Sequence, residues 1–326
     1  MQSHLAIIIC TWNRAQLLDQ TLAGLSKISA ADIDDVPHLI LVDNNSSDDT
    51  RAVAGRHEAL WPAGRFHYVF EHQQGKQFAL NSGIKAAVQL GCTICAFTDD
   101  DIDVPADWSQ RIIAAFDDAT VDLTGGKTLL QWSADGPPVW FHRNMIAILA
   151  GVDEGDQRLC PPPAGYAPAG SNMAARMALF ERVGGFSPTH FRHMDFEFGQ
   201  RCLRMGVGVS YEPGLVVVAP VDPQVLTKRY FRRWAFKAGI TPWQDMQPGV
   251  RHVAWVPAWL YRQLLQDAAL WLIAPLRGEP QPERFARELR IWRALGTISS
   301  RWISRLRPTM YPEWVKARSQ KRQNVY

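Results

Sequence analysis

Three consecutive acids, Asp99, Asp100 and Asp101, are the strongest chemical signal in the sequence. They follow an apolar run, residues 93–97, that is typical of a buried strand. Three carboxylates in a row repel one another, so their presence favours a compensating cation or ligand. Oxygen ligands on a loop suit Mg²⁺ or Mn²⁺, which takes one or two carboxylates together with substrate phosphates. The alternative interpretation is a solvated acidic turn that caps a helix.

A further acid, Asp43, ends a second apolar run, residues 39–42. The carboxyl ends of parallel strands meet at one edge of a sheet, where α/β proteins bind their ligands. Asp43 would there accept a hydrogen bond from a base or a ribose. Alternatively, it is a turn former ahead of Asn44 and Asn45.

Acids at one edge require strands that end together and helices that cover the sheet. Four apolar runs predict strands, at residues 5–9, 39–42, 66–70 and 93–97. Helical patterns lie between them, one after the plausible N-cap Asn13 and one over residues 76–90. This alternation predicts an α/β fold with a mixed, mostly parallel Rossmann-like sheet and helices on both faces.

The second half of the chain has weaker patterns. Residues 123–167, with Pro137-Pro138 and three prolines at 161–163, predict a loop-rich insert over a cleft. Residues 174–183 and 195–205 predict helices that end at glycines. Short strands at 207–211 and 215–218 and a helix at 225–238 follow.

The character of the sequence changes after about residue 250, where two amphipathic helices are predicted at 255–276 and 282–295. Residues 277–326 contain twelve Lys and Arg against four Asp and Glu, interleaved with Trp292, Trp302, Tyr311 and Trp314. Such a composition predicts a C-terminal helical extension that contacts an anionic membrane surface. The alternative is a solvated helical face followed by a mobile tail.

Composition excludes several classes of protein. With 47% hydrophobic and 21% charged residues, the chain is an ordinary globular protein, and its net charge of +3 gives no argument for a nucleic-acid partner. Of the five cysteines, Cys92 and Cys95 have a CxxC spacing. No second Cys/His pair lies nearby in the sequence, which favours a buried structural pair over a zinc or redox site. Neither a signal-peptide pattern nor a run of ~20 apolar residues is found. A cytoplasmic protein is expected, either soluble or attached to the inner face of the membrane.

Five segments, in this order, resemble the motifs of the family 2 glycosyltransferases, which have the GT-A fold. They are Ile9-Cys10-Thr11-Trp12-Asn13-Arg14, Val42-Asp43-Asn44-Asn45-Ser46-Ser47-Asp48, Gly75 with Ala79, Asn81, Ser82 and Gly83, Thr98-Asp99-Asp100-Asp101, and Gly184-Gly185-Phe186 followed by Asp195-Phe196-Glu197. The resemblance covers residues 5–239 and looks like that of a non-processive enzyme of bacterial polysaccharide synthesis. It implies metal-dependent, inverting transfer of a single sugar from a nucleotide sugar to a glycan or lipid-linked acceptor, with UDP as the commonest carrier.

The resemblance also implies roles for single residues. Mn²⁺ or Mg²⁺ would be held by Asp99 and Asp101, although the triplet leaves the register open and Asp100 is an alternative. Asp195 would be the catalytic base, with Glu197 as its acceptor-side neighbour or as a second candidate. Asn172 would either touch a sugar or cap the next helix. The donor-binding residues would be Thr11, Asn13, Arg14, Asp43, Lys76, Asp99 and Asp100.

Three positions depart from the family pattern. Met194 stands where the family usually has the Glu of a Glu-Asp pair, and Ala219 stands where relatives often carry a His before Pro. Ala219 cannot bind a metal, which puts metal affinity in doubt. Tyr230 replaces the Gln of the QxxRW motif of processive synthases.

These observations predict a GT-A domain over residues 1–240, with its acceptor-side part at about 123–240, and a basic helical region over 241–326. The alternative function is a catalytically degenerate nucleotide-sugar-binding scaffold of the same fold, for which Met194 and Ala219 are the clues. A haloacid dehalogenase-type phosphotransferase fits Asp101-Ile102-Asp103-Val104 but leaves the N-terminal segment unexplained. A Rossmann dehydrogenase is disfavoured because no GxGxxG follows the first strand.

Overall fold

The computed structural model describes residues 4–31, 36–190, 192–240 and 250–319. The chain forms two compact units, each made of two segments. The first unit comprises Met1–Gln131 and Ala150–Pro220, and the second comprises Trp132–Leu149 and Val221–Tyr326. The functional division at residue 240 that the sequence predicts stays a prediction.

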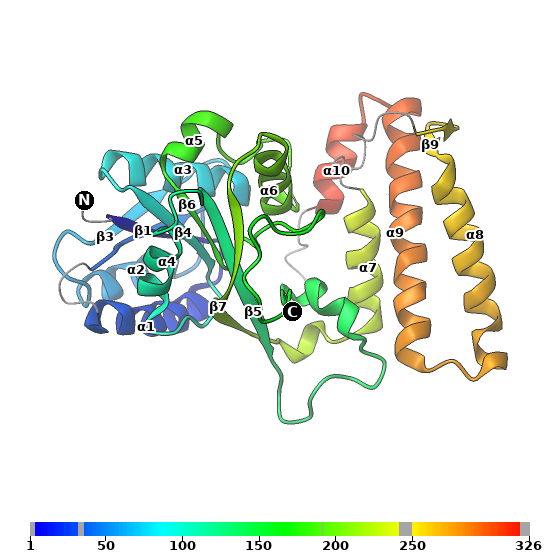
Figure 1. Ribbon diagram of the computed structural model, residues 1–326, viewed down its shortest axis with the longest axis horizontal. Helices are drawn as coiled ribbons and strands as arrows, with labels where there is room; N and C mark the ends of the chain where they lie inside the picture. The colour runs from blue at the N-terminus through cyan, green and yellow to red at the C-terminus, as the bar shows by residue number, and fades with distance from the viewer. Residues whose placement is uncertain (1–3, 32–35, 191, 241–249, 320–326) are drawn as a thin grey trace. The chain divides into compact units, whose positions relative to one another are not determined.

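The first unit is built on a seven-stranded sheet in the order β3-β2-β1-β4-β6-β5-β7 (Figure 1). All pairs are parallel except those that β6 makes with β4 and β5. The predicted fold class, a mixed and mostly parallel α/β sheet with a C-terminal helical extension, is therefore confirmed. The strands are β1 (Leu5–Thr11), β2 (His38–Asp43), β3 (Phe66–Phe70), β4 (Ile94–Asp99), β5 (Leu123–Gln131), β6 (Met173–Arg176) and β7 (Val209–Pro220).

Helices cover both faces of this sheet, as the continuous apolar runs of its strands require. Along β1, Ile7 and Ile9 belong to one core and Ala6 and Ile8 to the other, because successive side chains of a strand point to opposite faces. The first core is completed by α1 (Ala15–Ala31), α2 (Thr50–Glu58) and α4 (Trp108–Ala115). The second is completed by α3 (Lys76–Gln89), α5 (Ala178–Val183) and α6 (Met194–Arg204).

Two predictions about the local structure were wrong. The predicted helix at 174–183 begins as strand β6, and only Ala178–Val183 is helical. Alanine favours helices by propensity, but the pairing of this segment between β4 and β5 prevails. The region from residue 123 was predicted to be irregular, yet it forms β5. The Gly125-Gly126 pair conceals the strand pattern and has a packing reason, since a Cβ on Gly126 would lie 1.9 Å from the Leu215 carbonyl oxygen.

The second unit is helical. Its elements are η1 (Arg143–Leu149), η2 (Pro223–Val225), α7 (Lys228–Gly239), β8 (His252–Val253), β9 (Val256–Pro257), α8 (Ala258–Ile273), η4 (Ala274–Arg277), α9 (Gln281–Leu306) and α10 (Tyr311–Ser319). Helices α7 and α9 approach closely at Gly239 and Gly296, where added Cβ atoms would lie 2.0 Å from backbone carbonyl oxygens of the facing helix. The segment that contains η1 packs Met145, with Trp140 and Phe141, onto Phe231 and Phe285 of these helices.

Within the described ranges, every helix is too short or too polar to cross a bilayer.

Candidate active site

The triplet of acids lies where β4 ends, and its three carboxylates differ in exposure. Asp100 is buried, with 3% of its surface exposed. The side chains of Asp99 and Asp101 are 25% and 39% exposed. The middle carboxylate therefore points into the protein, while the outer two reach the surface at the carboxyl edge of the sheet.

Arg14 neutralises two of these acids. Its guanidinium donates to Asp100 and, at 2.8 Å, to Asp101 Oδ2. Thr11 Oγ1 donates to Asp100 Oδ2 at 2.7 Å, and Thr21 Oγ1 donates to the Asp100 carbonyl at 2.9 Å. Burial raises the pKa of Asp100, and Arg14 opposes this shift. Burial lowers the pKa of Arg14, but the two carboxylates more than offset this and raise it overall.

Lys76 neutralises the third acid. It begins α3 directly after Gly75, whose φ of 143° is rarely adopted by other residues, and its ammonium donates to Asp99. Burial lowers the pKa of Lys76, but Asp99 more than offsets this, so the pKa lies above its ordinary value. Cys10 lies within electrostatic range of Lys76 and Asp99, and burial raises the pKa of its thiol. A neutral thiol is a poor nucleophile.

Asp195 lies about 95 residues after the acid triplet in the sequence but within electrostatic range of Lys76. It lies in the first turn of α6, and its charge also contributes to raising the pKa of Lys76. Backbone amides fix its carboxylate: Gly170 N–H donates to Oδ2 and Phe196 N–H to Oδ1, both at 2.9 Å. The sheet edge thus brings Asp195, Lys76 and Asp99 into one electrostatic group.

Asp43 is the last residue of β2, and Asn13 lies in the loop that follows β1. Asp43 is buried, and its carboxylate accepts from Ser46 N–H at 2.8 Å and from Tyr68 Oη at 2.6 Å. Asn13 has a φ of 50°, its N–H donates to Ser46 Oγ at 2.9 Å, and its Oδ1 accepts from Ser47 N–H at 2.7 Å. These bonds join the loops after β1 and β2 into one wall beside Arg14.

Asn172 directly precedes β6, which pairs with β4, and its side chain is bound inside the protein. It is fully buried, its amide donates to the carbonyls of Lys127 and Leu215, and its Oδ1 accepts from Trp108 Nε1 at 3.0 Å. Its side chain does not cap the following helix; it joins β5, β7 and α4. A direct contact of Asn172 with a sugar stays a prediction.

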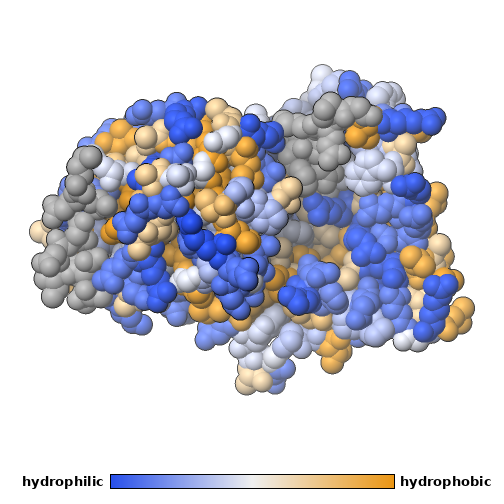
Figure 2. Space-filling view, in the orientation of Figure 1, coloured by the Kyte–Doolittle hydropathy of each residue, from blue (hydrophilic) through white to orange (hydrophobic). Residues whose placement is uncertain are grey.

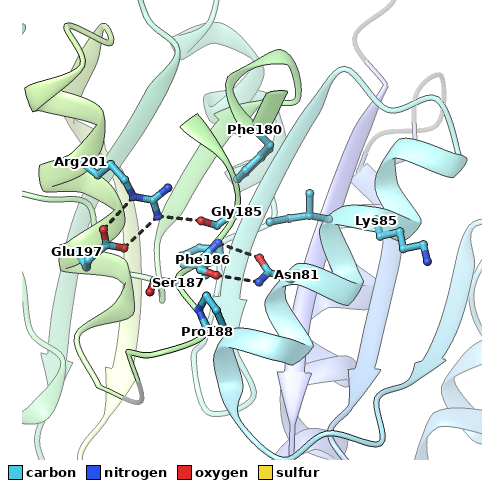
Figure 3. Close-up of a pocket in the computed structure, with 10 residues that line it drawn as sticks. Asn81, Lys85, Phe180, Gly185, Phe186, Ser187, Pro188, Glu197 and Arg201 are labelled. Atoms are coloured by element: carbon cyan, nitrogen blue, oxygen red, sulfur yellow. Dashed lines mark hydrogen bonds and ion pairs between the residues drawn. The ribbon is translucent and has the colours of Figure 1, made fainter. Parts of the chain in front are cut away.

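Glu197 lines an open pocket of about 710 Å³ beside α3 and α6 (Figure 3). It forms an ion pair with Arg201 at 2.9 Å, and Arg201 also donates to the carbonyls of Val183 and Gly185. Across the pocket, the Asn81 amide exchanges two hydrogen bonds with the backbone of Phe186. The resembling segments around Asn81 and Gly184-Gly185-Phe186 therefore contact each other, and the acceptor-side role of Glu197 stays a prediction.

The three departures from the family pattern have structural roles. Met194 is buried in the second core, next to Phe198. Ala219 is buried in the first core near the end of β7. In the second unit, the Tyr230 ring packs edge-to-face on Phe231 at 6.0 Å.

The carboxylates can be tested for their fit to a divalent cation. In the part of the chain that the structure describes, no three His, Cys, Asp or Glu side chains group into a complete metal site. Asp99 and Asp101 are nevertheless partly exposed oxygen donors, one at the end of β4 and the other two residues beyond it. Mg²⁺ and similar ions use one or two carboxylates when substrate phosphates supply further ligands. The pair fits a cation that binds together with a phosphorylated ligand.

Two groups that position the site's carboxylates were not predicted from the sequence. Tyr68 holds Asp43 from the neighbouring strand, and burial together with this bond raises the pKa of its hydroxyl. The Gly170 amide holds Asp195 across 25 residues. Neither belongs to a recognisable motif, since one contact depends on strand pairing and the other on a backbone atom.

Comparisons with known proteins concern the family and the fold of the chain. The family model described as Glycosyl transferase family 2 matches residues 6–184. A mannosyltransferase, PcManGT from Pyrobaculum calidifontis in complex with GDP-Man and Mn²⁺, has a similar fold, with a TM-score of 0.62 and 18% identity over 93% of this chain and 88% of that one. A mycobacterial protein of known crystal structure aligns with a TM-score of 0.46 and 16% identity over 72% of this chain and 74% of that one. No curated protein matches the sequence.

Proposed function

The chain belongs to glycosyl transferase family 2, and from this membership we propose that it transfers a single sugar, with inversion, from a nucleoside diphosphate sugar to an acceptor hydroxyl. The observation that carries the proposal is the group formed by Asp99, Lys76 and Asp195 at the carboxyl edge of the sheet. In this group Asp99 would bind a metal ion, Lys76 would bind a phosphate, and Asp195 would accept a proton. A family 2 enzyme needs these three functions in one place.

The proposed reaction is a displacement at the anomeric carbon. The acceptor oxygen forms its bond to this carbon from the face opposite the diphosphate, while the bond from the carbon to the diphosphate oxygen breaks. Asp195 takes the proton of the acceptor hydroxyl, and the nucleoside diphosphate leaves with the bonding electron pair. The amides of Gly170 and Phe196 hold the carboxylate in place for this transfer.

The cations and acids of the site act on the donor. Arg14 and Lys76 would exchange their carboxylate partners for the oxygens of the diphosphate. Asp99 and Asp101 would hold Mn²⁺ or Mg²⁺, whose positive charge stabilises the leaving diphosphate. Thr11, Asn13 and Asp43 shape the wall on which the nucleoside would lie.

Two nucleotides are candidates for the carrier of the donor sugar. UDP is expected as the commonest carrier of the family, and the complex of PcManGT with GDP-Man makes a GDP-sugar the second candidate. The acceptor is proposed to be a glycan or a lipid-linked glycan in a bacterial polysaccharide pathway. We place the enzyme in the cytoplasm at the inner face of the membrane, on the strength of the basic C-terminal region.

Calorimetric titration with UDP- and GDP-sugars tests the proposal, first with Mn²⁺ or Mg²⁺ and then with a chelator. We expect one donor to bind only with the metal and to lose this binding in Asp101→Ala. Asp195→Asn should retain donor binding and lose a factor of about 10²–10⁴ in turnover, because it lacks the base. Full turnover by Asp195→Asn would falsify the role of Asp195. Donor binding without turnover in the parent protein would support the degenerate scaffold instead.

A further inference from the structure

Helix α8 in the second unit packs one of its sides against α9. Leu260 is buried with Val256, Ala294 and Ile298, and Asp267 is buried in an ion pair with Arg290 at 2.6 Å. Trp271 lies beneath the Arg284 guanidinium, 5.4 Å from ring centre to carbon. These contacts attach α8 to α9 and account for one side of the helix only.

The opposite side of α8 is also apolar. Leu265, Leu272 and Leu276 are 70%, 68% and 89% exposed, and Trp259 is 44% exposed. Leu265 and Leu272, seven residues apart, lie on the side of α8 away from Leu260, while Trp259 flanks that side and Leu276 follows in η4. We call this surface, formed by Trp259, Arg262, Leu265, Leu272 and Leu276, the α8 face. A helix that is apolar on both sides is normally covered on both sides.

Along the segment that contains α8, the exposed charges are positive. Between residues 250 and 278 the cations are Arg251, Arg262 and Arg277, and the one acid is the buried Asp267. The next acid along the chain, Glu279, is paired with Arg287. Figure 2 shows apolar residues at the surface along the right margin, over α8, next to hydrophilic ones. Leucine and tryptophan bordered by arginine suit the headgroup region of an anionic bilayer.

We propose that the α8 face is the surface by which this protein lies on an anionic lipid bilayer. The apolar side chains would enter the boundary between headgroups and acyl chains, and Arg251, Arg262 and Arg277 would contact lipid phosphates. This inference rests on the proposed attachment to the membrane and assigns it to a defined surface, the side of α8, rather than to the basic C-terminal region as a whole.

A second copy of the chain fits this surface less well. The 20 residues from Ala258 to Arg277 span about 30 Å, and a strip about 10 Å wide covers about 300 Å². A stable interface needs about 800 Å² from each partner. Pairing two α8 faces would also bring Arg262 close to its own copy, whereas lipid phosphates supply the opposite charge.

The double variant Leu265→Glu/Leu272→Glu tests the proposal in the full-length protein. We expect the parent to sediment with vesicles of phosphatidylcholine and phosphatidylglycerol, and much less with phosphatidylcholine alone. The double variant should lose a factor of about ten or more in partitioning, because two leucines no longer enter the bilayer. The matched control is Leu60→Glu/Val88→Glu, which places the same charges on exposed residues of the first unit and should bind like the parent.

Other outcomes overturn the proposal in distinguishable ways. Vesicle binding that is equal in the double variant and the parent removes the α8 face and leaves membrane attachment intact. A parent that does not bind anionic vesicles removes both. A parent that is dimeric in size-exclusion chromatography and becomes monomeric in the double variant, without binding vesicles, identifies a second copy as the occupant. Circular dichroism melts check folding, and donor binding, measured separately by calorimetry, reports on the glycosyltransferase proposal alone.

Discussion

At the residue scale, each outer acid of the triplet already has a cation as partner. Lys76 holds Asp99, and Arg14 holds Asp101 together with Asp100. A divalent cation that binds first must displace these side chains, whereas one that arrives with a diphosphate offers them new partners. The site is therefore expected to bind metal and donor cooperatively.

Lys76→Gln tests this competition. Without its counterion, Asp99 should bind Mn²⁺ about tenfold more tightly in the absence of donor, since a charge-assisted hydrogen bond contributes about 1.5–3 kcal/mol. Donor affinity at saturating Mn²⁺ should fall by a similar factor. Isothermal titration measures both. Lys85→Gln makes the same change nine residues further along the same helix, in a side chain that lines the pocket beside Glu197 (Figure 3), and should change neither affinity. Unchanged Mn²⁺ binding in Lys76→Gln would contradict the competition.

The residue types at the site follow from the sequence, but their pairings do not. The run of acids after an apolar segment predicts carboxylates at a sheet edge, and the structure places them there. Thr11 and Asp100 are 89 residues apart, and Arg14 and Asp101 are 87 apart, so their contacts depend on which strands become neighbours. The burial of Asp100 between two partly exposed acids depends on the same geometry. The functional roles assigned to these residues stay predictions.

At the element scale, strands with unbroken apolar runs were predictable and those with mixed signals were not. The apolar run at residues 39–42 lies within the observed β2 and is buried throughout, as expected of a strand covered by helices on both faces. β6 is rich in alanine and β5 contains two glycines, so local propensity indicates other structures. Strand order decided both cases, and strand order is a property of long-range pairing.

Gly296→Ala tests the close crossing of α7 and α9. A Cβ there would lie 2.0 Å from the Phe236 carbonyl oxygen, so the helices must separate. We expect a loss of about 1–3 kcal/mol in the free energy of unfolding of the second unit, as for other overpacked cores. Urea titration followed by tryptophan fluorescence measures it.

The control for this substitution is Gly55→Ala in α2, where nothing lies within 4 Å of the added Cβ. Alanine is a better helix former, so this variant should gain about 0.5–1 kcal/mol. Equal effects of the two substitutions would mean that helix propensity, rather than the crossing, determines the result.

At the scale of the whole molecule, the two units have separate cores. The residues of the sheet cores all come from the first unit, and those of the helical cores come from the second. We therefore expect two transitions in scanning calorimetry. Donor and metal at about 100 times the Kd add about 2.7 kcal/mol to the first unit only. For a unit of roughly 200 residues, its transition should rise by about 5–10 °C.

The second transition serves as the internal reference in this experiment. It should stay in place when the donor is added and should fall in Gly296→Ala. A single transition, or a donor-induced shift of both, would show that the units unfold together.

The path of the chain between the units has a consequence for biosynthesis. Trp140, Phe141 and Met145 leave the ribosome early, but their partners on α7 and α9 follow much later, with Phe285 about 140 residues behind. At about 5–20 residues per second, these apolar side chains wait roughly 10–30 s for their core. During that time the nascent chain exposes a patch of aromatic side chains that a chaperone can recognise. A stop codon after β7 but before α9 makes this exposure permanent, so such truncated products should aggregate although their sheet is complete.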